Sequence, residues 1–157
     1  MAVTAAALLA ALDALPSTVA GGPYATDSGS SANINIMRTS TGAYWWKADM
    51  DIDTDGQPFP EQDNNSDRQT QTSFQQSDGK PLNSGKLPFI VIPLPSTRFR
   101  YRDAGIRGGD SCIVILNGKF VYAVFGDEGP TGIIGEASYA AAKALGVPGI
   151  QIGRAHV

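Results

Sequence analysis

The middle and later parts of the chain alternate apolar runs with polar turns, a pattern typical of β-strands. Residues 89–93 (FIVIP) form a short, continuously apolar run, as in a buried strand. Two further runs, 111–116 and 119–125, flank Asn117-Gly118, and this dipeptide between apolar runs is the strongest short-range signal for a β-hairpin. We therefore expect three strands here, two of them joined by a tight turn.

Helical patterns occur near both ends of the chain. The alanine- and leucine-rich start predicts an amphipathic helix that Pro16 ends. A second helix is predicted after Gly135, ending near Leu145-Gly146. Between the two helices, weaker strand patterns cover residues 33–36 and 43–49. The polar residues 57–86 predict a long loop, and such loops in compact domains are usually functional or mobile.

Together these elements predict a mainly β (α+β) fold. We expect a small six-stranded, β-barrel-like domain with an N-terminal helix and a second helix after a glycine-rich turn. The length of 157 residues suits one domain, with a helix in residues 1–19 and the compact part in 20–150. The codons inferred for the tail 151–157 match the start of a common sequencing adapter. We therefore predict that this tail is not native, and we exclude His156, the only histidine, from every site.

Charge and cysteine content exclude several classes of protein. The formal net charge is −3 and no basic stripe occurs, which argues against a nucleic-acid partner. No apolar run is long enough to span a bilayer, and the N-terminal segment lacks the positive residues of a secretion signal. Cys112 is the only cysteine, so the chain has no disulfide framework.

Two carboxylates flank the glycine-rich turn within residues 120–145. Asp127 is expected at the end of a strand, and Glu136 is expected in the first turn of the following helix. Such a turn can hold both carboxylates against one cleft, as glycoside hydrolysis requires. The alternative is structural, because Glu in a first helical turn also suits the helix dipole.

An acidic run, D-M-D-I-D-T-D-G, precedes the polar loop. If it forms a strand, alternation places Asp49, Asp51, Asp53 and Asp55 on one face. It also resembles the opening of an EF-hand, but Gln62 stands where that loop needs its closing Glu. Three interpretations remain open: another kind of calcium loop, an acidic wall for an amine-bearing ligand, or a solvated turn.

The aromatic run Tyr44-Trp45-Trp46 offers rings that can stack on sugars. At alternating positions of a strand at least one of these rings should instead pack in the core. Arg98, Arg100 and Arg102 share a period of two, and we expect them to pair with acidic residues rather than to bind an anion.

In their order along the chain, several motifs resemble glycoside hydrolase family 75, the chitosanases of fungi and bacteria. The resemblance covers about residues 24–148. The motifs that carry it are YATDSG, WKADMDIDTDGQ, SDGKPL, PSTRF, YAVFGDEGP and IIGEASYAAAKALG. The acidic run followed by G-D-x-G-P and I-G-E-A-S is the most specific part.

The resemblance implies endo-hydrolysis of β-1,4 links between glucosamine units of chitosan, with inversion. It implies Glu136 as general acid and Asp127 as general base, with no metal and no cofactor. A helix N-terminus at Glu136 would lower the pKa of that carboxyl, whereas an acid needs a raised pKa. Asp49, Asp51, Asp53 and Trp45 are the expected contacts to a cationic polysaccharide, and we expect a secreted monomer.

The sequence also departs from the family pattern. Thr54 stands where the family often has Cys, and Glu128 stands where Thr is usual, so we expect Glu128 to be a third carboxylate beside the base. The family continues past residue 148, which implies a C-terminal truncation here. Two other functions remain open: a non-catalytic carbohydrate- or calcium-binding β domain, and a wall-loosening or lytic barrel that uses Asp127 as its acid.

Overall fold

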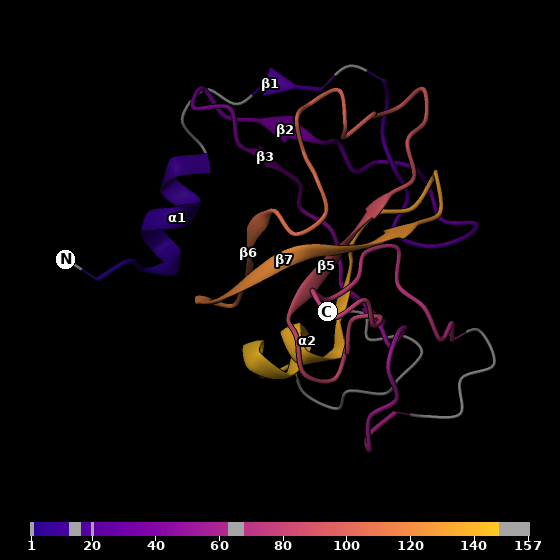
Figure 1. Ribbon diagram of the computed structural model, residues 1–157. Helices are drawn as coiled ribbons and strands as arrows, with labels where there is room; N and C mark the ends of the chain where they lie inside the picture. The colour runs from indigo at the N-terminus through magenta and orange to yellow at the C-terminus, as the bar shows by residue number, and fades with distance from the viewer. Residues whose placement is uncertain (1, 13–16, 20, 63–67, 148–157) are drawn as a thin grey trace.

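The computed structural model describes residues 2–12, 17–19, 21–62 and 68–147 (Figure 1). It is mainly β with two helices, which confirms the predicted fold class. The predicted helix end at Pro16 and the tail 151–157 lie outside the described residues. No helix in the described ranges is both long enough and apolar enough to cross a membrane.

The strands form two sheets. The smaller is antiparallel and joins β1 (Ser17–Thr18), β2 (Met37–Arg38) and β3 (Tyr44–Trp45). The larger has the order β4-β8-β5-β7-β6, with bounds Asp51–Asp53, Glu136–Ser138, Phe89–Pro93, Lys119–Gly129 and Ser111–Leu116. In Figure 1, β5 and β7 cross the middle of the molecule, between the small sheet above and α2 below.

The predicted hairpin is confirmed. β6 and β7 pair antiparallel from Ser111 opposite Val124 to Leu116 opposite Lys119. Asn117 and Gly118 have φ of 48° and 77°, the positive values that a two-residue turn of this kind requires. Beyond the hairpin, β7 continues to Gly129 and pairs in parallel with β5.

Side chains of β5 alternate between two differently covered faces of the large sheet. Ile90 and Ile92 face two apolar clusters, one containing the residues of α2 (Tyr139–Leu145) and the other an aromatic group with Tyr101 and Phe125. Phe89 and Val91 face the opposite way and pack against Leu82 from the long polar loop. We call this second side the loop face of the sheet.

Two of the predicted strands are shorter than expected. The strand expected at 33–36 is reduced to a bridge between Ile34 and Tyr24, and the strand expected at 43–49 is only β3. The N-terminal helix, α1, covers Ala5–Leu12. Apolar residues alone do not extend a strand where no adjacent segment of the protein pairs with their backbone.

The second helix begins later than predicted, so the expected position of Glu136 in its first turn was wrong. Ser138 is the N-cap: its hydroxyl accepts the Ala141 N–H at 3.3 Å, and its backbone is extended. Glu136–Ser138 form β8, because they pair in parallel with β4. The helix ends as predicted, with Gly146 as a left-handed C-cap at φ 73°.

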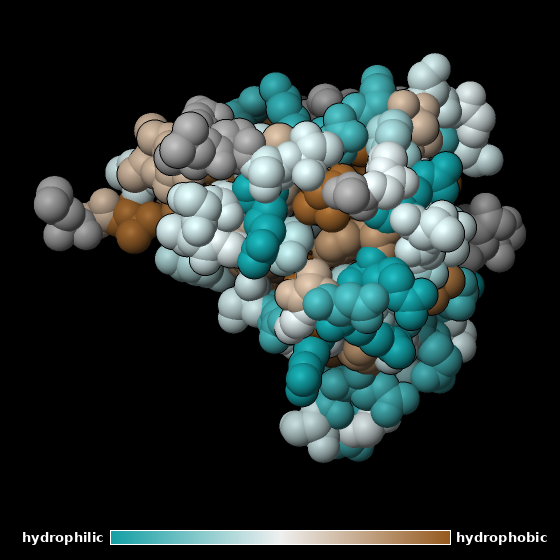
Figure 2. All heavy atoms as spheres, turned by 90° about the horizontal axis from the view of Figure 1, so that it is seen from above, coloured by the Kyte–Doolittle hydropathy of each residue, from teal (hydrophilic) through white to brown (hydrophobic). Residues whose placement is uncertain are grey.

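Figure 2 looks down on the molecule from the side of the small sheet. Hydrophilic residues cover most of this view, and a smaller hydrophobic area lies near its centre. Exposed large apolar side chains include Tyr122 and Ile113, which lie opposite each other on the β6–β7 hairpin.

Candidate active site

Asp127 reaches the loop face because β7 carries a bulge. Ile90 pairs with Phe125 and Val91 pairs with Asp127, so Gly126 is the extra residue between them. Phe125 packs in the aromatic cluster, and in a regular strand Asp127 would point to that same side. A Cβ on Gly126 would lie 2.6 Å from the Cβ of Phe89, so a glycine is needed here. The bulge thus turns Asp127 from the aromatic cluster to the loop face.

The Asp127 side chain is held by two backbone donors. The N–H groups of Ser73 and Glu128 each donate to Asp127 Oδ1, and both N···O distances are 2.8 Å. The residue is buried, at 6% exposure. Two N–H donors on one oxygen suit a negatively charged carboxylate.

Glu136 lies on the same face, on β8, which is separated from β7 by the single strand β5. Ile90 pairs with Ala137 in antiparallel orientation, so Val91 follows opposite Glu136 and separates it from Asp127. Glu136 Oε2 lies over Gly129, where a Cβ would approach it to 2.6 Å. Gly129 therefore makes room for the Glu136 carboxylate.

Burial is the main cause that raises the pKa of Glu136 to about 7. The negative charges of Asp51, Asp55 and Asp127 raise it further. Glu136 lies on β8, two residues before the helix N-cap, and not in the first helical turn where a lowering of its pKa by the helix dipole was expected. A carboxyl with this pKa stays protonated in mildly acidic solution and is able to donate a proton.

The acidic run surrounds these two residues. Asp51 pairs in register with Glu136, and Asp53 pairs with Ser138, so both lie on the loop face. One carboxylate oxygen from each of Asp53, Asp55 and Asp127 lies within 4.8 Å of the other two. Burial, followed by the charges of Asp55, Asp127 and Glu136, raises the pKa of Asp53 to about 8, although the Asp55 N–H that it accepts acts against this. The three oxygens are close enough to bind one cation together.

Only part of the predicted binding set gathers here. β4 ends at Asp53, so alternation does not extend from Asp49 to Asp55. At Asp49 it is the backbone carbonyl that lies 2.6 Å from the Cβ position of Gly135. Trp45 is half-buried on β3, in the small sheet, and its buried Nε1 has no hydrogen-bond partner among the described residues. Trp45 thus lies in the small sheet, whereas the loop face belongs to the large one.

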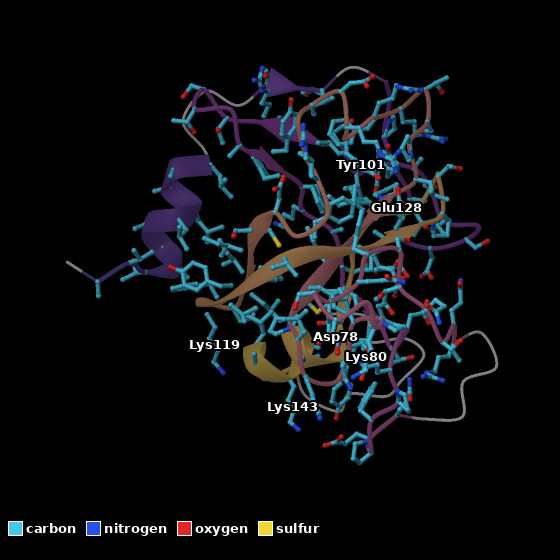
Figure 3. All side chains as sticks on the ribbon, in the orientation of Figure 1. Asp78, Lys80, Tyr101, Lys119, Glu128 and Lys143 are labelled. Carbon is cyan, nitrogen blue, oxygen red and sulfur yellow. The ribbon has the colours of Figure 1, made fainter. Side chains whose placement is uncertain are left out.

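The sequence predicted Glu128 as a third carboxylate beside Asp127, and this prediction was wrong. Its side chain accepts a hydrogen bond from Tyr101 Oη and lies 3.7 Å from Arg102 Nη2 (Figure 3). Arg102 Nε also donates to Tyr101 Oη at 3.1 Å. Successive strand residues point to opposite faces, so Glu128 extends away from the loop face.

Sequence reasoning missed three residues of this site. Asp55 was noted only as part of the acidic run, whereas its charge raises the pKa of Glu136. Ser73 lies in the polar loop, where no local pattern distinguishes it from its neighbours. Gly129 was noted only as one glycine of the glycine-rich turn, yet it provides the space for Glu136. The alternation D-x-D-x-D is the one sequence signal that included Asp55.

Comparison with known proteins relates the sequence of this chain to a family. A family model described as fungal chitosanase of glycosyl hydrolase group 75 matches residues 50–156, a range that contains Asp51, Asp53, Asp127 and Glu136. The chain is also similar to Endo-chitosanase C of Aspergillus oryzae, with 35% identity over 104 residues. That alignment covers 64% of this chain and 25% of the relative, so it spans a quarter of the relative's length. Because the family model matches more than half of the chain, the protein belongs to glycosyl hydrolase group 75.

Proposed function

We propose that this protein is an endo-acting chitosanase that hydrolyses β-1,4 links between glucosamine units with inversion. The observation that carries the proposal is the pairing of unlike carboxyls on the loop face. Glu136 has a pKa raised to about 7, and Asp127 accepts two N–H donors. One group suits a proton donor and the other a proton acceptor, as glycoside hydrolysis requires.

In the proposed reaction Glu136 gives its proton to the glycosidic oxygen as the bond to the anomeric carbon breaks. Asp127 takes a proton from a water molecule whose oxygen attacks that carbon from the opposite face of the sugar. Glu136 ends ionised and Asp127 ends protonated, so a proton must return to Glu136 before the next cycle.

The spacing of the two strands supports inversion. Asp127 and Glu136 lie on either side of Val91, which separates their backbones by two strand spacings, or about 10 Å. Inverting enzymes need about 6.5–9.5 Å between the carboxyl groups to admit a water, whereas retaining enzymes need only about 5–5.5 Å. Two side chains that lean towards each other across Val91 would fall in the larger range.

The carboxylates around the reacting pair support a cationic substrate. Chitosan carries protonated amines, and the charge of Asp51 would favour them over neutral, acetylated units. Asp53, whose pKa is raised to about 8, would contact the sugar as a neutral hydrogen-bonding group. We keep Asp49 and Trp45 as weaker candidates for subsites farther along the chain of sugars. Chitosan is a polymer that a cell does not take up intact, so the proposal includes secretion of the enzyme. A monomer suffices for the chemistry.

The test is the release of reducing ends from highly deacetylated chitosan, with Asp127→Asn and Glu136→Gln as the two variants. NMR of the first products should show the anomer opposite to that of the cleaved bond. Retention of the anomer would refute inversion. Full activity in either variant, with folding intact, would refute the assigned roles.

A calcium-binding β domain is the second candidate, and the oxygens of Asp53, Asp55 and Asp127 favour it. It would place a cation on the residue proposed as the base. Calorimetry separates the two candidates: a melting temperature that rises with calcium, together with no release of reducing ends, would replace the first proposal by the second.

A further inference from the structure

A short piece of the polar loop contacts two of the carboxylates on the loop face. The N–H of Gln69 donates to Asp55 Oδ1 at 2.7 Å, and the N–H of Ser73 donates to Asp127 Oδ1 at 2.8 Å. Gly56 N–H in turn donates to the carbonyl of Gln69 at 3.0 Å, which joins this piece to the chain after β4. We call residues 68–74 the strap.

Ser73 makes its contact with both its backbone and its side chain. Its N–H donates to Asp127, while its Oγ accepts the N–H of Glu128 at 3.2 Å. The Glu128 N–H is shared between Ser73 Oγ and Asp127 Oδ1. Ser73, Asp127 and Glu128 thus form a closed set of hydrogen bonds, although Ser73 lies more than fifty residues away in the sequence.

The two neighbours of Ser73 are firmly anchored. Thr72 is buried, and its Oγ1 donates to the Phe74 carbonyl at 2.6 Å and accepts the Leu82 N–H at 2.9 Å. The ring of Phe74 meets Phe125 edge-on, with 4.8 Å between centroids, and lies over Gly108, where a Cβ would approach it to 2.1 Å. Because both neighbours are fixed, the Ser73 N–H is directed at Asp127 before any substrate arrives.

We propose that Ser73 is a positioning residue for Asp127, and that the strap fixes the orientation of the catalytic base from outside its own strand. The proposal rests on the function proposed above. Both N–H donors use Oδ1, which leaves Oδ2 of Asp127 to accept the proton of the attacking water. Loss of the Ser73 contacts lets the carboxylate rotate, which lowers the rate of the chemical step without removing any group that binds sugar.

The direct test replaces the amide between Thr72 and Ser73 by an ester, using a hydroxy-acid analogue of serine. This change removes one N–H and keeps every side chain. We expect kcat to fall at least about tenfold, with KM within about twofold, because a hydrogen bond to a charged group is lost. An ester variant with unchanged kcat would overturn the proposal.

Side-chain variants separate positioning from general support of the loop. Ser73→Ala keeps the N–H but releases the strap from Glu128, and we expect kcat to fall between about threefold and tenfold. Ser73→Thr retains the hydroxyl and should restore most of the loss. Ser77→Ala is the matched control, because Ser77 is exposed in the same loop and lies outside these hydrogen bonds. Equal losses in Ser73→Ala and Ser77→Ala would overturn the proposal.

Amide hydrogen exchange tests the contact without any activity. The Ser73 amide should exchange slowly, and at least about tenfold faster in Asp127→Ala, which removes the acceptor, while the Leu82 amide remains protected. Equal exchange of the Ser73 amide in both proteins would refute the contact itself. If exchange behaves as expected but no chitosan is cleaved, then the proposed function fails while the strap stands.

Discussion

Two adjacent residues of β7 show how differently the two faces of the sheet treat a carboxylate. Asp127 points to the loop face, where Asp53 and Asp55 lie within 4.8 Å of it through their oxygens. Glu128 points the other way and meets a phenol and a guanidinium, Tyr101 and Arg102. Asp127 thus has other carboxyl groups as its neighbours, whereas Glu128 has hydrogen-bond donors.

This difference distinguishes the loop face, which carries the candidate site, from the opposite face, where Glu128 supports the fold. Burial on the loop face is the largest cause that raises the pKa of Glu136 to about 7 and that of Asp53 to about 8, and nearby negative charges add to it. On the other face, burial and then the Glu128 carboxylate raise the pKa of the Tyr101 phenol, so it remains a donor. Carboxyl groups with raised pKa values gather on the loop face, which makes this face the candidate site.

The largest effect should come from the reacting carboxyls. Glu136→Gln and Asp127→Asn should each lower kcat on chitosan at least about a hundredfold, because each removes a proton donor or acceptor. Glu128→Gln is the matched variant on the opposite face of the same strand and should lose less than tenfold. Rates of reducing-end release, with circular dichroism to verify folding, measure all three.

This comparison has a clear point of failure. If Glu128→Gln lost as much activity as Asp127→Asn while remaining folded, then the two faces would not differ in function. The assignment of Glu128 to a supporting role would then be wrong.

The second prediction concerns stability against pH. The folded protein holds protons on Asp53 and Glu136 at pH values where the unfolded chain has released them, since the ordinary pKa values of these groups are 3.8 and 4.5. This contribution is fully present below about pH 4 and is lost as pH rises through 7 and 8. The melting temperature should therefore fall between pH 5 and pH 9.

The control for this prediction is a pair of variants. Asp53→Asn should flatten the pH dependence and raise the melting temperature at pH 9. Asp78→Asn, whose carboxylate is exposed and paired with Lys80, should leave the slope unchanged. A melting temperature that stays constant from pH 5 to pH 9 in the unmodified protein would refute the raised pKa values.

Local patterns predicted the parts of this molecule that depend on neighbours in sequence. The Asn117-Gly118 hairpin and the Gly146 helix cap follow from backbone conformations that few residues adopt. The pair Asp127 and Glu136 was predicted from a glycine-rich turn between two acidic residues together with the family resemblance, and both residues lie on the loop face. These features need no knowledge of tertiary contacts.

The missed features all depend on distant partners. Glu136 forms a strand and not a helical turn because β4 pairs with it, although more than eighty residues separate them. The direction of Glu128 depends on the bulge at Gly126, where Phe89 and Leu82 leave no room for a side chain. No pattern in the polar loop marks Ser73, because its role comes from what lies opposite.

The third prediction concerns the supporting face. Glu128→Ala should lower the melting temperature by about 3–6 °C, because the Tyr101 hydroxyl then loses its acceptor in a buried place. Glu61→Ala breaks an exposed pair, Glu61 to Lys143 at 3.4 Å, and should have a smaller effect. Equal shifts in calorimetry would mean that the Tyr101–Glu128 contact adds no more than a surface ion pair.

The smallest expected effect tests the electrostatics of the loop face most directly. Asp51 lies in register with Glu136, and its negative charge raises the pKa of that carboxyl after burial does. Asp51→Asn should therefore lower the pKa of Glu136, and the loss of activity at high pH should begin at a lower pH, by about half a unit. KM for chitosan should also rise, and most at low ionic strength, because a charge that attracts the cationic substrate is gone.

The two readouts for Asp51→Asn depend on different physics, so together they locate the residue. If the loss of activity at high pH shifts while KM stays unchanged, then Asp51 acts on Glu136 alone and does not face the substrate. If KM rises while the loss of activity at high pH does not shift, then Asp51 binds sugar and burial by itself sets the pKa of Glu136. Lys80→Gln controls for long-range effects of net charge, because it removes one exposed positive charge in the polar loop, a change equal in size and opposite in sign to that of Asp51→Asn. If Lys80→Gln shifted the loss of activity at high pH as far in the opposite direction, then the pKa of Glu136 would depend on the overall charge of the protein and not on the carboxylates of the loop face.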